Sequence, residues 1–271
     1  MRRFKILFFW IFINRNNVSF SEMLNFLFKP TINILAKKYV QETIEGDDDV
    51  KVVLKGYKYP LYWPKSFSFN RLDQVVCETF DSNDWHYYQK EHTEIKNGEH
   101  LLDIGTAEGL FPLTVQEMCT HIYLIEPGKT FNATLNKTFE PIQDKITIYN
   151  VAVGNEDGEI MFSEDSLDGK ITNGTEANSE KITICRIDTL MKDKKVTYLK
   201  ADIEGFEQEM LKGAAETIIR NKPKIAITTY HDQNNPDEII TLIKSYVPEY
   251  NYYVKGIYEK TPKPVLIHFW I

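Results

Sequence analysis

Cysteine is scarce in this sequence of 271 residues, which has three cysteines far apart and no Cys-x-x-Cys pair. An odd number without close spacing argues against a disulfide framework and against a zinc site, and it is typical of a reducing compartment. A long apolar run is also missing near the amino terminus, because residues 6–13 give eight apolar residues in a row, too few to span a bilayer. We therefore expect a cytoplasmic protein.

Charge is unevenly distributed along the chain. The net charge is −7, but residues 1–40 carry seven basic residues and one acid, or +6, which leaves −13 for the remainder. A basic, aromatic segment on an acidic body favours contact with a membrane surface or a partner over nucleic acid. Three interpretations of residues 1–13 stay open: a helix packed on the body, an interfacial helix that holds the protein peripherally at the inner membrane face, or a signal peptide, although no small-x-small cleavage site follows.

The first part of the chain, residues 1–49, is predicted to be a basic, partly helical segment. Residues 20–40 have a helical pattern that Pro30 interrupts. Residues 42–49 are acidic and contain a glycine, so we interpret them as a link and a domain boundary.

The second part, residues 50–97, is predicted to be a β/α lead-in to the main domain. Residues 50–69 alternate and are rich in β-branched and aromatic types, which indicates one or two strands. Residues 70–97 have helical patterns. Their aromatic second half, residues 85–95, leads directly into a glycine loop, so we expect this helix to cover the pocket.

The third part, residues 98–271, alternates between strands and helices, which indicates a mostly parallel sheet with right-handed crossovers. A hairpin-like insertion with a polar loop at 163–180 interrupts the alternation, and the last strand is expected to run antiparallel. The predicted fold class is α/β: a doubly wound, mostly parallel seven-stranded, Rossmann-like sheet with an N-terminal helical and β extension. The expected strands are residues 100–104, 122–125, 146–153, 196–201, 224–230, 250–257 and 264–271, and the expected helices are residues 110–119, 129–139, 206–221 and 236–247.

One stretch, residues 100–109, reads as a short strand that ends in an acid, then a glycine loop that opens a helix. Glycine allows left-handed backbone angles there, and the helix start points free N–H groups at a ligand. Ligands of such sheets lie at the carboxyl ends of the strands. Five strand ends carry polar or small residues: Asp103–Gly105, Glu126, Val151–Ala152, Asp202–Glu204 and His231.

The glycine loop favours a methyl donor over a dinucleotide. Glu126 follows Gly105 by 21 residues, where an acid accepts hydrogen bonds from ribose hydroxyls in either kind of ligand. Counted from Gly105, the G-x-G-x-x-G pattern is incomplete, since Ala107 and Leu110 replace its other glycines. Glu108 would also be unfavourable beside a pyrophosphate, which S-adenosylmethionine lacks.

Several spaced segments resemble known methyltransferases. The stretch Asp103-Ile-Gly-Thr-Ala-Glu-Gly109, then Leu-Phe, resembles motif I of class I methyltransferases, and Glu126-Pro127 and Val151-Ala-Val-Gly154 also fit. A second set is similar to the FkbM-type family, which usually has K-x-D-x-E-G-x-E followed by L-x-G-A; the matching segments are Ile187-Asp-Thr-Leu190, Leu199-Lys-Ala-Asp-Ile-Glu-Gly-Phe-Glu207 and Leu211-Lys-Gly-Ala214. The resemblance covers about residues 98–231. It departs at Ala107, where the family commonly has Asn, and before His231, where an acid is common.

The resemblance implies transfer of a methyl group from S-adenosylmethionine to a hydroxyl of a sugar, a glycan or another small molecule, as in polysaccharide biosynthesis. The implied cofactor contacts are Asp103, Gly105, Thr106, Ala107, Glu108, Gly109, Glu126, Val151, Ala152 and Asp202. His231 is the natural general base, because its ordinary pKa is near neutral. Asp202 and Glu204 can hold the acceptor, assist the base or face the sulfonium, and they could bind Mg²⁺, although no metal is predicted.

Plainer roles and other functions remain as alternatives. Glu204 could cap the following helix, and His231 could be a hydrogen-bonded strand-end residue. The chain could be a non-catalytic binding or scaffold protein with the same fold, or an NAD-dependent oxidoreductase, which the loop disfavours. A nucleic-acid acceptor is not expected, because the fourth strand lacks an Asn/Asp-Pro-Pro-Tyr end and the body is acidic.

Overall fold

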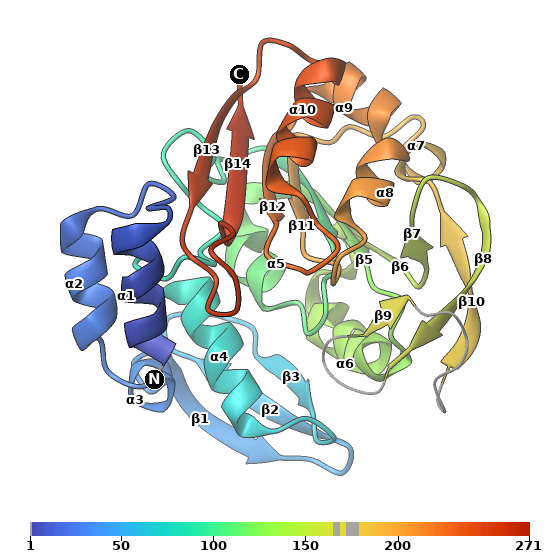
Figure 1. Cartoon of the computed structure of the whole chain (residues 1–271). Helices are drawn as coiled ribbons and strands as arrows, with labels where there is room; N and C mark the ends of the chain where they lie inside the picture. Colours follow the sequence, from blue (N-terminus) through green and yellow to red (C-terminus); the bar gives the residue numbers. More distant parts are fainter. Residues whose placement is uncertain (1, 165–168, 172–178) are drawn as a thin grey trace.

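The computed structural model describes residues 2–164, 169–171 and 179–271 and has a seven-stranded central sheet (Figure 1). The strand order is β13-β14-β12-β11-β4-β5-β6. Only β14 runs in the direction opposite to the other six strands of this sheet, so the predicted sheet with its antiparallel last strand is confirmed. The strands are β4 (Glu99–Ile104), β5 (Cys119–Ile125), β6 (Ile146–Tyr149), β11 (Tyr198–Ala201), β12 (Lys224–Thr228), β13 (Asn251–Lys255) and β14 (Leu266–Trp270).

Helices cover both faces of this sheet. Successive side chains of a strand point to opposite faces, so Leu101 joins one apolar cluster and Leu102 joins the other. The cluster around Leu101 includes residues of α4, α5 and α6, and the cluster around Leu102 includes residues of α8, α9 and α10. The helical elements are α4 (Phe69–Phe80), α5 (Leu110–Val115), η1 (Gln116–Met118), α6 (Lys129–Phe139), η2 (Glu140–Lys145), α7 (Ile187–Leu190), α8 (Glu207–Lys212), α9 (Ala215–Asn221) and α10 (Pro236–Tyr246).

The helix expected at residues 206–221 is divided in two. A Cβ atom on Gly213 would lie 1.9 Å from the carbonyl oxygen of Gly154, so the chain passes too close there for any other residue. The helix ends at this contact and α9 begins two residues later.

The N-terminal extension contains three helices and a three-stranded antiparallel sheet. The elements are α1 (Arg2–Phe12), α2 (Phe20–Phe28), α3 (Ile32–Ala36), β1 (Val40–Glu45), β2 (Asp49–Leu54) and β3 (Leu61–Pro64). Pro30 separates α2 from α3, as expected. The link predicted at residues 42–49 is wrong over its first half, because Thr43 and Ile44 are β-branched and pair with β2. The boundary placed at residue 49 therefore falls inside a β-hairpin.

The helix predicted at residues 85–95 is also wrong, because these residues form turns. Side chains at the start of the segment compete with helical hydrogen bonding. A carboxylate oxygen of Asp81 accepts from the N–H of Asn83, and one of Asp84 accepts from the N–H of His86. His92 has a positive φ of 77°.

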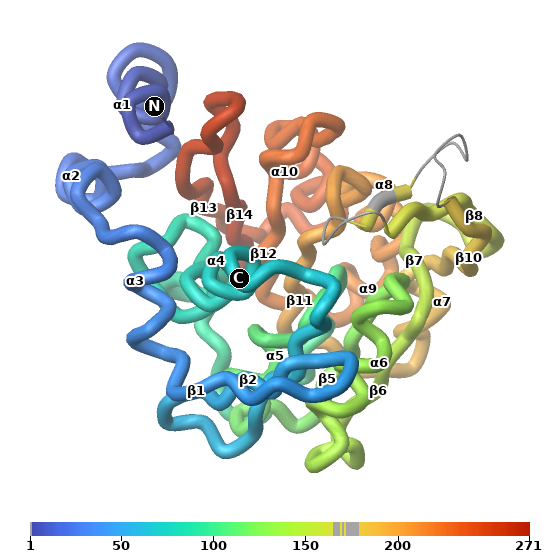
Figure 2. The backbone as a smooth tube through the Cα atoms, turned by 90° about the horizontal axis from the view of Figure 1, so that it is seen from below, coloured from blue at the N-terminus to red at the C-terminus, as the bar shows by residue number. Residues whose placement is uncertain are grey.

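The insertion forms a second small sheet at the end of the molecule opposite α1 and α2 (Figures 1 and 2). Its order is β7-β10-β8-β9, with β7 (Ala152–Val153), β8 (Gly158–Ser163), β9 (Lys170–Ile171) and β10 (Ser179–Cys185). The strand expected at 146–153 therefore contributes to two sheets. Most of the loop predicted at 163–180 lies outside the described residues.

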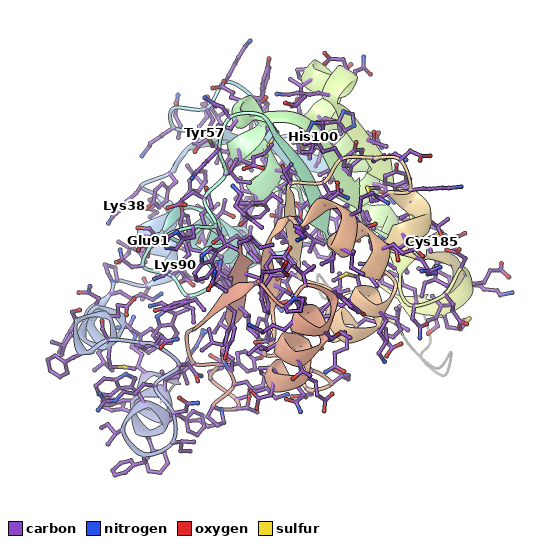
Figure 3. All side chains as sticks on the ribbon, turned by 90° about the horizontal axis from the view of Figure 1, so that it is seen from above. Lys38, Tyr57, Lys90, Glu91, His100 and Cys185 are labelled. Carbon is purple, nitrogen blue, oxygen red and sulfur yellow. The ribbon has the colours of Figure 1, made fainter. Side chains whose placement is uncertain are left out.

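The described part of the chain has no helix long and apolar enough to cross a membrane. The three cysteines are free, and Figure 3 shows Cys185 at the insertion, on the opposite side from Lys38 in the N-terminal extension.

Candidate active site

A cavity opens at the carboxyl ends of β4, β5 and β11, the edge predicted from the strand ends. Its empty volume is about 1230 Å³, including the space at its mouth. Helix α4 and the insertion contribute further walls through Arg71, Gln74 and Phe162. The cavity is therefore bounded by the sheet edge, by α4 and by the insertion.

The glycine loop forms the floor of the cavity beside β11. Gly105 has a φ of +67°, and a Cβ atom there would lie 1.8 Å from the carbonyl oxygen of Asp202. Only glycine permits this conformation and this approach without strain. The loop at the end of β4 is thereby held directly against the residue that ends β11.

Glu126 connects the same loop to the end of β5. Its carboxylate accepts hydrogen bonds from the N–H of Ala107 at 2.9 Å and from the N–H of Gly128 at 2.7 Å. Burial raises the pKa of Glu126 to about 7. Each carboxylate oxygen can accept a second hydrogen bond, so Glu126 can still receive ribose hydroxyls.

Asp103 is fully buried and pairs with Lys200, which occupies the register position opposite it on β11. Nζ of Lys200 lies 3.1 Å from a carboxylate oxygen of Asp103 and donates to the carbonyl oxygen of Gly105 at 2.7 Å. Burial alone would lower the pKa of Lys200, but the Asp103 carboxylate outweighs it and raises it. The pair fixes the start of the glycine loop.

The cavity wall is strongly acidic. Among its described lining residues, two side chains are basic, Arg71 and Lys200, and six carry carboxyl groups: Glu78, Asp103, Glu108, Glu126, Asp202 and Glu204. Burial raises the pKa of Glu108 to about 7, as for Glu126. A bound cation would favour the ionised carboxylates, whereas a pyrophosphate would be repelled by them.

Asp202 and Glu204 line the cavity just after the end of β11. One Asp202 oxygen accepts from the hydroxyl of Tyr88 at 3.0 Å, and the other lies 3.0 Å from the hydroxyl of Thr228. Burial alone would raise the pKa of Asp202, but the charges of His231 and Lys200 lower it. Glu204 has a positive φ of 55° in the tight turn between β11 and α8.

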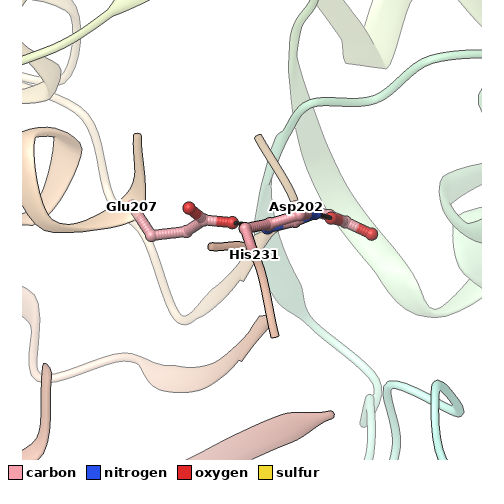
Figure 4. Close-up of side chains that lie close together, drawn as sticks. All are labelled: Asp202, Glu207 and His231. Atoms are coloured by element: carbon pink, nitrogen blue, oxygen red, sulfur yellow. Dashed lines mark hydrogen bonds and ion pairs between the residues drawn. The ribbon is translucent and has the colours of Figure 1, made fainter. Parts of the chain in front are cut away.

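His231 is buried and is not among the residues that line the cavity. Figure 4 shows its ring between the carboxyl groups of Asp202 and Glu207. Its Nδ1 lies 2.8 Å from a Glu207 oxygen, and its Nε2 lies 3.3 Å from Glu204 and 3.7 Å from Asp202. Burial alone would lower the pKa of His231, but the carboxylates of Glu204, Glu207 and Asp202 raise it to about 11. The imidazole is therefore protonated at neutral pH.

Glu207 is a residue of this cluster that sequence reasoning did not select. It is fully buried in the first turn of α8, and its second oxygen accepts from the side-chain amide of Asn234 at 2.7 Å. One ligand atom each of Asp202, Glu207 and His231 lies within 4.8 Å of the others, a spacing that could hold a metal ion. Hydrogen bonds to Glu207 from Thr228, His231 and Asn234 account for this arrangement.

The structure brings the predicted site residues together with two exceptions. Every residue predicted to contact the cofactor lines the cavity except Gly109, which caps the start of α5. Of the three predicted catalytic residues, Asp202 and Glu204 line the cavity and His231 does not. Sequence reasoning missed Tyr88, Lys200 and Glu207. Lys200 could have been found as a lysine within the apolar strand β11, and Glu207 as the last acid of the family motif.

The sheet order, the glycine loop and the acidic strand ends define a Rossmann-like methyltransferase fold. The family model for the methyltransferase FkbM domain matches residues 103–253, more than half of the chain. The chain therefore belongs to the FkbM methyltransferase family. The resemblance noted in the sequence is confirmed.

The comparison with solved structures gives a match with a TM-score above 0.5, which agrees with the fold. An FkbM methyltransferase from Methylobacillus flagellatus KT is 22% identical, with a TM-score of 0.54, and the match covers 68% of this chain and 46% of that chain. The METTL16 methyltransferase domain (14% identity, TM-score 0.45) matches over 91% and 94% of the two chains. A precorrin-6y C5,15-methyltransferase from Geobacter metallireducens GS-15 (9% identity, TM-score 0.40) matches over 83% and 98%. The comparison with curated proteins gave no match.

Proposed function

We propose that the protein transfers a methyl group from S-adenosylmethionine to a hydroxyl group of a sugar, a glycan or another small molecule. The observation that carries this proposal is the acidic wall of a cavity that also contains the glycine loop and Glu126. The donor is a sulfonium cation, so six carboxyl groups around it favour its binding. The same wall argues against an NAD-dependent oxidoreductase, whose cofactor brings a pyrophosphate.

Glu126 is proposed to bind the ribose hydroxyls of the donor, with Val151 and Ala152 beside it on the wall. The acceptor would enter between α4 and the end of β11, where Tyr88 holds Asp202. Aligning the acceptor oxygen with the donor methyl group is the main task of such a site, because the sulfonium is already activated.

In the proposed reaction, the acceptor oxygen forms a bond to the methyl carbon while the bond from carbon to sulfur breaks, which leaves S-adenosylhomocysteine. The hydroxyl proton must go to a base. His231 was expected to accept it, but the pKa of about 11 keeps its imidazole protonated. We therefore assign the proton to Glu204, which lines the cavity and whose side chain is about one-third exposed. Both oxygens of Asp202 already lie within hydrogen-bond distance of hydroxyls, those of Tyr88 and Thr228, so we assign Asp202 the role of orienting the acceptor.

Thermal unfolding with different ligands tests the donor first. At about 100 times its dissociation constant, a ligand adds about 2.7 kcal/mol of stability. S-adenosylmethionine and S-adenosylhomocysteine should each raise the melting temperature by several degrees, and NAD should not. Methyl transfer to sugar acceptors then tests the reaction. Donor binding without turnover on any hydroxyl acceptor would support a non-catalytic binding protein instead.

A further inference from the structure

The N-terminal helices expose an apolar surface that the methyltransferase site does not need. Of the fifteen large apolar side chains exposed in the described chain, nine lie within residues 4–34. On α1 and the residue after it these are Phe4, Phe8, Ile11, Phe12 and Ile13, on α2 Phe20, Leu24 and Phe28, and on α3 Ile34. We call this set the apolar N-terminal surface.

The exposed residues follow helical spacing. Phe20, Leu24 and Phe28 are four residues apart, so they form one stripe along α2, and Phe4, Phe8 and Phe12 do the same on α1. Four of these phenylalanines are strongly exposed: Phe4 (75%), Phe12 (69%), Phe20 (66%) and Phe28 (81%). The rings of Phe8 and Phe12 lie 5.0 Å apart. Two apolar stripes on neighbouring helices mark an interaction surface rather than scattered exposure.

The helices that carry this surface are held firmly to the body and to each other. Their other faces bury Ile6, Trp10 and Met23 in the core. The Arg3 guanidinium donates to the carbonyl oxygens of Leu27 and Lys29, each at 2.6 Å, and so joins α1 to the end of α2. Figures 1 and 2 show the two helices side by side at one corner of the molecule. The surface is therefore preformed.

The charge distribution indicates which kind of partner the apolar N-terminal surface binds. The surface is accompanied by the exposed basic residues Arg2, Lys5, Arg15, Lys37 and Lys38. Residues 1–40 carry +6, whereas the rest of the chain carries −13. A bilayer with anionic headgroups attracts the basic N-terminal residues and repels the acidic remainder of the chain. The charge distribution therefore turns the N-terminal helices toward the membrane. Aromatic side chains with flanking Lys and Arg are the usual composition of interfacial helices.

We propose that α1 and α2 lie in the interface of an anionic membrane and hold the protein there peripherally. Helices of eleven and nine residues are too short to cross a bilayer. They are long enough to bury a stripe of phenylalanines at the boundary between headgroups and acyl chains. This proposal is independent of the methyl transfer proposed above.

Sedimentation of the full chain with vesicles tests the proposal. The protein should bind vesicles of phosphatidylcholine mixed with phosphatidylglycerol at least about tenfold more tightly than vesicles of phosphatidylcholine alone, and high salt should weaken binding. Phe8→Ser combined with Phe28→Ser should abolish binding. Ile219→Ser is the matched control, because Ile219 is 49% exposed on α9, and it should bind like the wild type.

A second variant separates charge from apolar burial. Lys37→Glu with Lys38→Glu should reduce the preference for anionic vesicles by about fivefold per residue or more, and thermal unfolding should confirm that each variant is folded. Failure of the wild type to sediment with either vesicle at low salt would overturn the proposal. So would a Phe8/Phe28 variant that sediments normally, or a wild-type dimer that this variant makes monomeric while lipid binding is absent.

Discussion

Charge is concentrated around the imidazole of His231. Three carboxylates surround it, and Glu207, the only one of them that is fully buried, fixes the orientation of the ring through Nδ1. The other ring nitrogen faces the two carboxylates that line the cavity. The positive charge of the imidazole lowers the pKa of Asp202, so His231 acts on the reaction through a residue that lines the cavity. His231 is in this sense a positioning residue.

Replacement of His231 by Gln removes that positive charge. We expect the pKa of Asp202 to rise, turnover to fall by about 10- to 1000-fold, and the acidic limb of the pH profile of kcat/KM to move to higher pH. Donor binding measured by calorimetry should change little. Asn234→Ser is the control, because it removes one hydrogen bond to Glu207 but no charge. A titration near pH 6.5 in the wild-type rate profile that disappears in the His231→Gln variant would instead support His231 as the base.

Replacement of Glu126 by Gln should weaken donor binding. Hydrogen bonds to charged groups contribute about 1.5–3 kcal/mol, so the dissociation constant for S-adenosylhomocysteine should rise by about 10- to 150-fold. Titration calorimetry measures this directly. Asp157→Asn is a matched control, because Asp157 also accepts from a backbone N–H, that of Arg186, but does not line the cavity. Equal affinities for the wild type and the Glu126 variant would show that the ribose contact is misassigned.

At the scale of elements, the glycine loop depends on a close approach between β4 and β11. Gly105→Ala would place a methyl group on the carbonyl oxygen of Asp202 and would force a left-handed backbone on alanine. The second effect alone costs about 1–3 kcal/mol. We expect the melting temperature to fall by several degrees and donor binding to be lost.

Gly158→Ala provides the comparison for this variant. Gly158 begins β8, and a Cβ atom there would meet no atom within 4 Å. This variant should unfold and bind the donor like the wild type. If Gly105→Ala behaved in the same way, the contact between the loop and β11 would not be needed for donor binding.

The sequence predicts those elements that local pattern alone determines. Strand periodicity, glycine positions and the βα alternation predict the central sheet and the edge where the cavity lies. The strand β1 was missed because its acidic composition argued for a link, while pairing with β2 decides its structure. The turns at residues 85–95 were missed because aromatic residues mimic a helical pattern there.

The residues missed at the site share one cause, which is contact between distant parts of the chain. Lys200 faces Asp103 only because β11 lies beside β4 in a register that no local pattern contains. Glu207 meets His231 because the turn after β11 and the end of β12 converge. Tyr88 reaches Asp202 from a segment without regular structure. Spacing predicts strand ends, whereas these partners require the assembled sheet.

At the scale of the whole molecule, buried charge makes stability depend on pH in one direction. Glu108 and Glu126 have pKa values raised to about 7, so their contribution to stability falls as the pH rises from about 4.5 through 7. Burial alone would lower the pKa of His86, but Glu78 and Asp84 outweigh it and raise it to about 9. The stabilisation from His86 is therefore complete below pH 6.5 and is lost as the pH rises through 9. The pKa of His231 is raised to about 11, so its contribution to stability is likewise lost as the pH rises from 6.5 through 11.

The protein without ligand should therefore be most stable at mildly acidic pH. The shift of His86 alone corresponds to about 3 kcal/mol, because one pKa unit is about 1.4 kcal/mol, and a chain of this size loses about 2–4 °C per kcal/mol. We expect the melting temperature to fall by several degrees between pH 6 and pH 9, measured by calorimetry at constant ionic strength. S-adenosylmethionine should reduce this fall, because its sulfonium compensates the ionised carboxylates of the cavity, whereas neutral S-adenosylhomocysteine should reduce it less. A melting temperature that rises between pH 6 and pH 9 would contradict the buried-charge argument, and equal effects of the two ligands would mean that the acidic wall does not recognise the sulfonium.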